Sequence, residues 1–212
     1  EKKVFHLPGK QLPIGQYRII TGEMPVQELK ALAQSYGASL TEFLVAVYFY
    51  SLQHIQEIVM ADKIRGRWDP VSVMVPVNLR RILHSNTMRN FFLTLNPLLD
   101  TRLGHYELNE IVNKVHHFMH TQLDHRHLKQ QISRNVKGAL HPLLRISPLW
   151  IKNIGLKMIY RDFGESRFSG SLSNLGKIEF SPSLDEIIDT VEFVPPPSSA
   201  LGVKCGALSY RG

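Results

Sequence analysis

Cysteine is almost absent from this sequence of 212 residues, and long hydrophobic runs are absent as well. The single cysteine, Cys205, excludes an internal disulfide framework and a cysteine-based zinc site, which is the pattern of a cytoplasmic protein. We expect its thiol to be packed within a strand. The most apolar stretch, residues 43–50, is far too short to span a bilayer, and residues 1–6 contain no apolar signal core. We therefore predict a cytoplasmic location and no membrane span.

Several catalytic motifs are also missing. The sequence contains no Gly-x-Ser-x-Gly elbow, no Gly-x-x-x-x-Gly-Lys-Ser/Thr loop and no Gly-x-Gly-x-x-Gly turn. These absences argue against nucleotide hydrolysis and dinucleotide chemistry.

The charge balance is basic but not concentrated. Lys and Arg number 25 against 18 Asp and Glu, a formal charge of +7, yet no run of five or more like charges occurs. A basic surface suits an anionic partner, including nucleic acid. However, the aromatic residues are not interleaved with the basic ones as single-strand binding platforms require. Nucleic acid is therefore the least favoured class of partner.

Residue patterns predict a chain of alternating helices and strands. Strands are predicted at residues 17–21, 71–77, 91–95, 170–174, 187–194 and 203–210. Helices are predicted at residues 26–36, from 39 onward, and at 107–123, 126–137 and 148–160. Ser39 and Glu42 form a capping box that opens the second helix, which is apolar on every face and should be central. Pro76 restricts its strand to a strand end or an edge position.

This order of elements predicts the α/β fold class. We expect a two-layer sandwich in which helices pack on one face of a mixed sheet, as a single domain over residues 1–212. The last predicted strand is followed at once by Tyr210-Arg211-Gly212, in the middle of what the pattern suggests is a hairpin turn. We therefore expect the chain to be truncated at both ends.

Histidines are concentrated in one region, since six of the ten lie between His105 and His127. His116, His120 and Asp124 follow one helix line at i, i+4 and i+8, a spacing that could hold zinc or nickel. Such a site needs a further ligand from another element and supporting carboxylates, and the sequence places neither. We therefore predict no metal site, and adventitious binding is the favoured alternative.

The same helix contains a His-x-x-x-Asp sequence, which is the core of a catalytic signature in several acyltransferases. Helical periodicity places His117, His120 and Asp124 on the polar side. The opposite arc holds Leu108, Ile111, Val112, Val115, Phe118 and Met119. A solvated helix face is the favoured interpretation, and we predict no catalytic residue in this chain.

Five polar residues at strand ends are candidates for binding a substrate. Arg80 would either clamp an anionic group or make a structural ion pair. Asn90 suits either a turn or an amide directed into a pocket. Ser171 and Ser173 share one strand face, with Asn174 pointing opposite to them. Small polar residues there would let a substrate approach the backbone, although strand termination explains the asparagine equally well.

The order of five short motifs resembles the chloramphenicol-acetyltransferase-like superfamily, in particular its alcohol O-acetyltransferase and condensation-domain branch. The motifs are Ser39-Leu40-Thr41-Glu42-Phe43-Leu44, Pro76-Val77-Asn78-Leu79-Arg80, Asn90-Phe91, Leu172-Ser173-Asn174-Leu175-Gly176 and Leu208-Ser209-Tyr210-Arg211-Gly212. The resemblance covers nearly the whole chain from about Tyr17.

The resemblance implies that the chain is the C-terminal half of a two-half acyltransferase. In that superfamily a substrate tunnel lies between two similar α/β halves, and the catalytic His-His-x-x-x-Asp-Gly belongs to the N-terminal half. His120 cannot substitute, because Met119 precedes it and His125 follows Asp124 where the family has glycine. The chain alone is therefore expected to be inactive. By resemblance, Ser173 and Asn174 line the tunnel, and a donor there would help to stabilise an oxyanion.

For the intact protein, the resemblance implies that a histidine general base activates an alcohol or amine, which attacks an acyl thioester. The thioester of coenzyme A or of a carrier protein is then a cosubstrate, and no covalently bound cofactor is expected. The implied partners are the N-terminal half and the small acceptor molecule. Apolar surface exposed where the halves meet could also drive self-association. Two other hypotheses stay open: a non-catalytic docking module of the same fold, and a nucleic-acid-binding domain.

Overall fold

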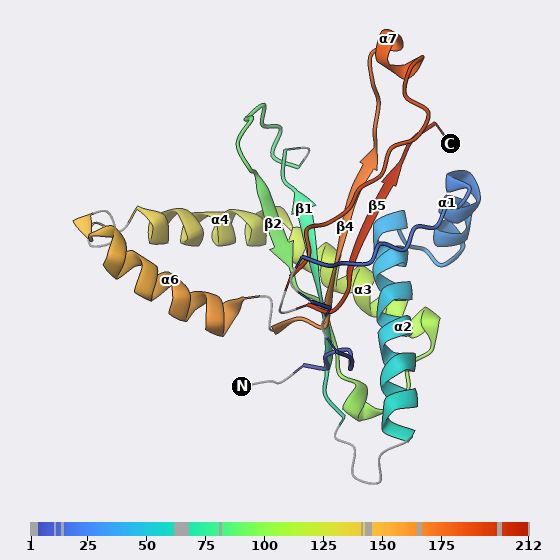
Figure 1. Cartoon of the computed structure of the whole chain (residues 1–212), viewed down its shortest axis with the longest axis horizontal. Coiled ribbons are helices and arrows are strands. Elements are labelled where there is room, and N and C mark those ends of the chain that lie inside the picture. Colours follow the sequence, from blue (N-terminus) through green and yellow to red (C-terminus); the bar gives the residue numbers. More distant parts are fainter. Residues whose placement is uncertain are drawn as a thin grey trace.

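The computed structural model describes residues 4–10, 12–13, 15–61, 68–80, 82–140, 142, 146–164, 167–198 and 201–211. The helices are α1 (Val26–Ser35), α2 (Leu40–Ala61), the 3-10 helix η1 (Thr101–Leu103), α3 (Leu108–Leu123), α4 (His125–Ala139), α6 (Leu149–Phe163) and α7 (Pro182–Asp185). The strands are β1 (Val71–Asn78), β2 (Phe92–Leu95), β3 (Leu98–Leu99), β4 (Gly170–Lys177) and β5 (Lys204–Ser209). The predicted α/β class is confirmed (Figure 1).

One open, mixed sheet organises the fold, with the strand order β2-β1-β4-β5 and with β3 also paired to β1. The strands β1, β4 and β5 are parallel to one another, whereas β2 and β3 are antiparallel to β1. The C-terminal ends of the three parallel strands therefore meet at one edge of the sheet. In Figure 1 this edge is the upper one, toward which all three arrows point.

The proline in β1 lies where the strand has a neighbour on one side. Pairing with β4 consists of Val73 with Gly170 and Met74 with Ser171. Pro76 lies beyond this stretch and opposes Thr94 of β2. A strand proline lacks a backbone donor and is tolerated only where that donor is not needed. The predicted restriction of Pro76 to a strand end is therefore confirmed, although β1 itself is central in the sheet.

The core lies between one face of the sheet and the helices α2 and α3. Alternate β1 residues, Val71, Val73 and Val75, are buried, as the period of a strand requires. They join Phe49 of α2 and Ile111 of α3 in one apolar cluster. Burying such side chains contributes about 1.5–3 kcal/mol each. This cluster is what fixes the two helices on the sheet.

Buried glutamines tie the second half of α2 to the connections around it. Gln56 donates to the Asp69 carbonyl at 2.9 Å and accepts from the Thr101 hydroxyl at 2.9 Å. Gln53 donates to the Tyr106 carbonyl at 3.0 Å and accepts from its amide at 3.1 Å. A buried amide without such partners would destabilise the fold by about 1–3 kcal/mol. The helix is thus central as predicted, but its burial is not purely apolar.

Two predicted strands are wrong, because residues 17–21 and 187–194 form no ladder in the structure. Strand propensity stabilises a segment only when a neighbouring strand and a packed face are present. Ile20 is 86% exposed and has neither. The second segment leads into Pro195, which cannot donate a ladder hydrogen bond. Cys205 lies in β5 as expected, but its side chain is exposed rather than packed.

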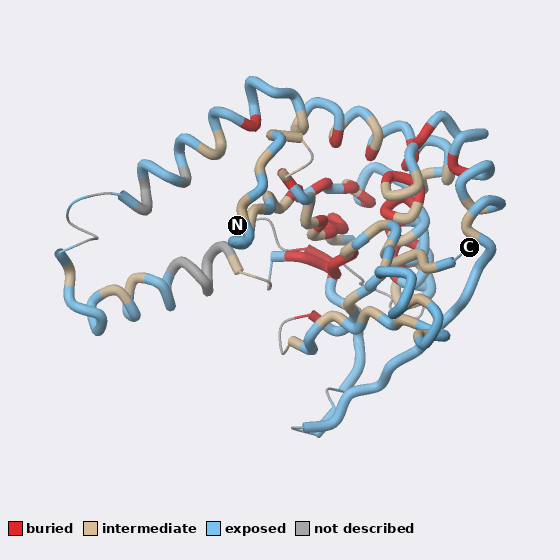
Figure 2. The backbone as a smooth tube through the Cα atoms, turned by 90° about the horizontal axis from the view of Figure 1, so that it is seen from above, coloured by how far each residue is buried: buried red, intermediate tan, exposed pale blue. Residues whose placement is uncertain are grey.

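The helices α4 and α6 form an arm that leaves the body of the protein (Figure 2). Leu128 is fully buried at the base of α4, whereas the apolar side chains of α6 are open to solvent. Trp150, for example, is 65% exposed. None of the helices in the described part of the chain joins the length and the apolarity that crossing a membrane requires. The arm therefore presents several large apolar side chains to solvent.

Replacement of Gly170 by alanine tests the packing of α2 on β4. A Cβ atom at Gly170 would lie 2.8 Å from Tyr48 Cζ and closer still to the Tyr48 hydroxyl, which donates to the Val203 carbonyl at 3.2 Å. We expect Gly170→Ala to lower the free energy of unfolding by about 1–3 kcal/mol through overpacking. Urea unfolding followed by circular dichroism measures the change. Gly22→Ala, where a Cβ atom meets nothing within 4 Å, should leave stability unchanged; equal losses would contradict the packing argument.

Candidate functional site

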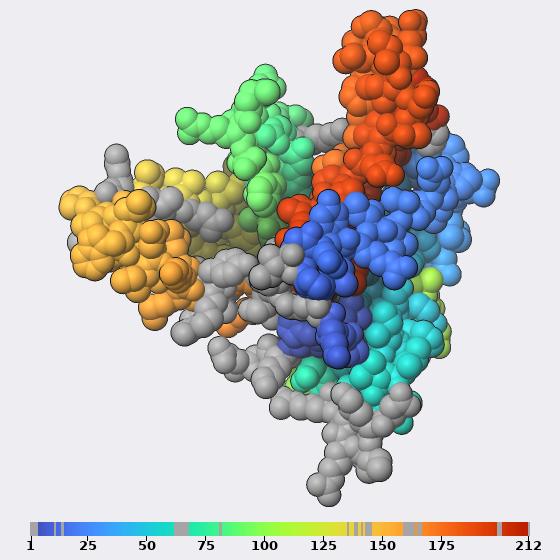
Figure 3. All heavy atoms as spheres, viewed as in Figure 1, coloured from blue at the N-terminus to red at the C-terminus, as the bar shows by residue number. Residues whose placement is uncertain are grey.

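The edge where β1, β4 and β5 end is the first candidate for a functional site. In open sheets with parallel strands, ligands bind beyond the carboxyl ends of the strands. The β1–β2 hairpin rises on one side of this edge, and the segment that carries α7 rises on the other. Figure 3 shows the surface hollowed between the two.

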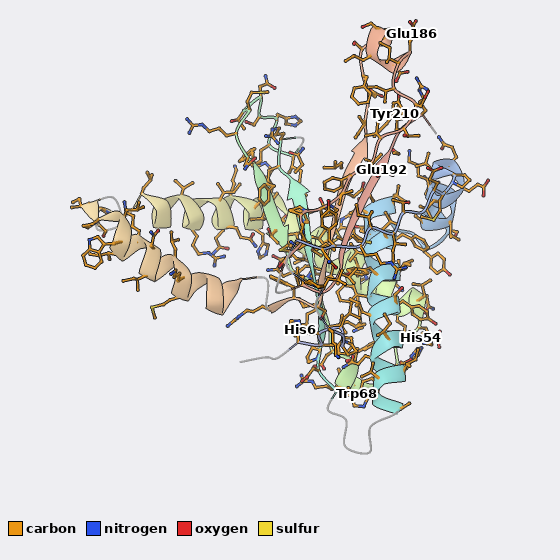
Figure 4. All side chains as sticks on the ribbon, in the orientation of Figure 1. His6, His54, Trp68, Glu186, Glu192 and Tyr210 are labelled. Atoms are coloured by element: carbon orange, nitrogen blue, oxygen red, sulfur yellow. The ribbon has the colours of Figure 1, made fainter. Side chains whose placement is uncertain are left out.

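Tyr210 holds the segment that carries α7 in place. Its hydroxyl group lies 2.8 Å from Asp185 Oδ1 and 2.9 Å from the Ile188 carbonyl, and its ring meets Phe180 edge-on. Figure 4 labels Tyr210 beside this segment. One side of the hollow is therefore a braced structure rather than a loose loop.

Ser173 is the predicted site residue that lies on the more open part of the sheet. Gly170 faces Tyr48 of α2, so strand alternation turns Ser171 and Ser173 to the face away from that helix. On that face Ser171 is buried, whereas Ser173 and Pro76, nearer the edge, are half-buried. The predicted sharing of one face by the two hydroxyls is the geometry observed.

Asn174 points to the other side of β4, toward α2. Its amide nitrogen donates to Thr41 Oγ1 at 3.0 Å, and its carbonyl oxygen accepts from the Gly176 amide at 2.9 Å. Gly176 has a φ of 77°, the left-handed conformation that favours glycine. The asparagine thus links the first turn of α2 to the turn that ends β4. The structure does not bring its amide to the face that carries Ser173.

Arg80 braces the β1–β2 hairpin. Its Nε donates to the Thr87 carbonyl at 2.9 Å, another guanidinium nitrogen donates to the Arg89 carbonyl, and its backbone amide donates to Asn78 Oδ1 at 3.0 Å. These contacts are neither an anion clamp nor the ion pair that the sequence suggested. Asn90 follows on the same hairpin and is exposed. In the described part of the chain, neither side chain hydrogen-bonds to β4.

A second polar cluster lies at the start of α2, beneath α3. The Glu42 side chain is only 7% exposed. Its Oε2 accepts from the Ser39 amide at 2.7 Å, and Ser39 Oγ accepts from the Glu42 amide at 3.4 Å, which confirms the predicted capping box. His116 Nδ1 lies 3.2 Å from Oε2, and His120 Nε2 lies 3.6 Å from Oε1. Both carboxylate oxygens therefore face polar partners.

The surroundings of Glu42 keep it ionised. Burial opposes the charged form, but the hydrogen bonds from the Ser39 amide and from His116 outweigh it, so the pKa of Glu42 lies below its ordinary value. A buried carboxylate without partners would be strongly destabilising. His116 of α3 and the capping residue Ser39 therefore stabilise a charge that α2 places inside the protein.

Asp124, the third member of the predicted histidine line, does not join this cluster. It lies between α3 and α4, and its Oδ2 accepts from the Arg126 amide in the first turn of α4 at 2.9 Å. That hydrogen bond is the main cause of the lowered pKa of Asp124. His117 is exposed on the polar side of α3, as predicted. The sequence does not reveal that Glu42 neighbours the histidines of α3, because a capping box does not show which helix packs over it.

Comparison of the chain with protein-family models, with curated proteins and with solved structures finds no match.

Replacing Glu42 by glutamine tests the buried cluster. Glutamine preserves the volume and the capping acceptor but removes the charge that faces the two histidines. We therefore expect the free energy of unfolding to fall by about 1–3 kcal/mol. Thermal and urea unfolding at neutral pH provide the measurement. Glu110→Gln is the matched control, because Glu110 occupies the same capping-box position in α3, accepts from the Glu107 amide at 2.8 Å and is exposed. If both variants lose the same free energy of unfolding, capping alone accounts for the contribution of Glu42 to stability.

Proposed function

We propose that this chain forms one wall of an acyl-transfer site and is the C-terminal half of a chloramphenicol-acetyltransferase-like fold. The N-terminal half of the same protein would supply the other wall and the catalytic histidine. The reaction moves an acyl group from a thioester of coenzyme A or of a carrier protein to an alcohol or amine. The observation that carries the proposal is Ser173, half-buried on the open face near the C-terminal edge of three parallel strands.

The surroundings of Ser173 suit a wall that a substrate approaches closely. Its register partner in β5 is Gly206, and a Cβ atom there would lie 2.6 Å from the Phe193 carbonyl. The segment before β5 thus crosses the sheet directly beside Ser173. Between that crossing and β1, β4 itself presents the small side chains of Ser171 and Ser173. A hydroxyl donor at this position would help to stabilise a tetrahedral oxyanion.

The other candidate residues act on the wall in different ways. Ser171 continues the hydroxyl face toward the interior. Asn174 positions β4 against α2, and Arg80 sets the shape of the hairpin that borders the site. Asn90, exposed on the hairpin, would lie at the rim of the tunnel.

The exposed apolar side chains favour an extensive interface with another protein or domain. They gather on α6 and continue in the preceding connection, with Ile146, Leu149, Trp150, Ile154 and Leu156 more than half exposed. Side chains project from both helices of the α4–α6 arm in Figure 4. Isolated apolar residues are ordinary on a surface, but a contiguous set marks an interaction site. We assign this surface to contact with the second half of the fold.

The same surface favours the second hypothesis, a docking module of this fold without catalysis. The two hypotheses differ in whether the biological role of the protein requires catalysis. If the intact protein retains its biological role when the histidine of its N-terminal half is replaced by alanine, the docking module is correct. If the role is lost while the fold is kept, acyl transfer is correct.

Ser173→Phe tests the wall directly. In the protein with both halves present, a phenyl ring at this position fills the space above β4, and we expect kcat/KM to fall at least about tenfold, because displacement of a substrate by about 1 Å is sufficient for larger losses. The measurement is thioester-dependent acylation of alcohols and amines. The chain by itself should show no activity.

The control is Ser51→Phe, which adds the same ring at an exposed position of α2. It should leave kcat/KM unchanged. Full activity of Ser173→Phe, or activity of the isolated chain, would refute the proposed division of roles between the two halves.

The exposed surface of α6 predicts self-association of the isolated chain. Sedimentation velocity should show an apparent mass that rises with concentration, because these exposed apolar side chains are open to contact with a second copy of the chain. Trp150→Glu combined with Ile154→Glu should abolish the rise. Leu103→Glu, at an exposed apolar residue of η1, should not. A chain that stays monomeric at every concentration would contradict the assignment of this surface to an interface.

A further inference from the structure

We infer that Glu42, His116 and His120 form a binding site for a divalent transition-metal ion, and that Zn²⁺ fits it best. The three residues come from two helices, and one ligand atom from each lies within 4.8 Å of the others. The inference does not depend on acyl transfer, because it concerns the face of the sheet that α2 and α3 cover.

The donor atoms lie close to the separations that a zinc ion requires. Zinc binds imidazole nitrogen and carboxylate oxygen at about 2.0–2.2 Å, so two ligands of a tetrahedral site lie about 3.3–3.6 Å apart. Glu42 Oε2 is 3.2 Å from His116 Nδ1, and Oε1 is 3.6 Å from His120 Nε2. The imidazole rings lie on the same side of α3 with their centroids 4.2 Å apart. The two distances end on different oxygens of the carboxylate, and one ligand atom from each residue lies within 4.8 Å of the others, so the side chains have to draw together by about 1 Å to centre an ion.

The donor set selects the class of metal. Two imidazoles and one carboxylate suit Zn²⁺ and its neighbours Ni²⁺ and Co²⁺, whereas Mg²⁺ and Ca²⁺ require oxygen ligands throughout. The carboxylate is held from behind by the Ser39 amide, the kind of supporting hydrogen bond that orients metal ligands. The His120 side chain is 68% exposed, which gives the ion an entry path and leaves room for a water ligand.

Metal binding exchanges protons for the ion. Without a metal, an ionised carboxylate can only accept, so His116 Nδ1, 3.2 Å from Oε2, donates its N–H to Glu42, whereas His120 Nε2, 3.6 Å from Oε1, is too distant for a hydrogen bond. Coordination needs a lone pair on those same ring nitrogens, and the protons move to the other ring nitrogen or to solvent. The ion then becomes the counter-charge of Glu42. This exchange distinguishes a metal site from a purely structural hydrogen-bond cluster.

The full chain, purified without a histidine tag, tests the inference by isothermal titration with Zn²⁺ and by the visible spectrum of added Co²⁺. We expect one ion per chain and a tetrahedral Co²⁺ spectrum. His120→Ala should weaken Zn²⁺ binding more than about 100-fold, beyond the loss caused by removing a supporting group. His120 is exposed, so this variant should fold normally, and circular dichroism checks that it does. His116→Ala gives a second, independent loss.

Two controls separate this site from its alternatives. Asp124→Asn should leave the affinity unchanged, because Asp124 caps a helix end outside the cluster. His127→Ala removes an exposed histidine of the same region and should also have no effect. The inference is overturned if the unsubstituted chain binds no Zn²⁺, if binding survives His120→Ala, or if either control variant loses it.

Discussion

The buried carboxylate of Glu42 imposes a constraint that the elements around it have to satisfy. An ion taken out of water costs several kcal/mol unless it is paired and hydrogen-bonded, and a domain is stable by only about 5–15 kcal/mol in total. The helix itself contributes part of the compensation, since a negative charge in the first turn interacts favourably with the helix dipole. The remainder has to come from outside α2. The capping residue Ser39 and the histidines of α3 provide it, so the packing of α3 over the start of α2 is fixed by electrostatics as well as by apolar contact.

The residue before Glu42 extends this constraint to the sheet. Successive helical residues point about 100° apart, so Thr41 faces β4 while Glu42 faces α3. Thr41 accepts the hydrogen bond from Asn174, and Asn174 in turn accepts from the Gly176 amide, where the pairing of β4 with β5 shifts register between Asn174 and Lys177. One helical turn therefore sets the position of a helix on one side and of a strand end on the other. The position of Ser173, next to Asn174 on the opposite face, follows from this link.

The sequence predicted the elements whose signals are local. The capping box of Ser39 and Glu42, the β1 alternation and the restricted place of Pro76 depend on neighbouring residues, and all three agree with the structure. The failures concern contacts between distant residues. Residues 17–21 have strand composition but no neighbouring strand, and nothing in their own sequence reveals this. The histidine line on α3 was visible, but its third partner is 74 positions away from His116 in the chain. Helical spacing offered Asp124 instead, which tertiary structure assigns to a cap.

The proposed wall at Ser173 and the proposed metal site at Glu42 share a connection but not a face, and the strength of that connection limits their influence on each other. The path from the histidine cluster to Ser173 passes through the hydrogen bond between Thr41 and Asn174. A hydrogen bond of this kind contributes about 0.5–1.5 kcal/mol net, which corresponds to a change of roughly two- to tenfold in an equilibrium. An ion bound at Glu42 would therefore stabilise the packing of α2 and α3 strongly while altering events at the wall only slightly. Removing the ion should loosen the fold before it changes any chemistry at Ser173, and this order separates a structural metal from a catalytic one.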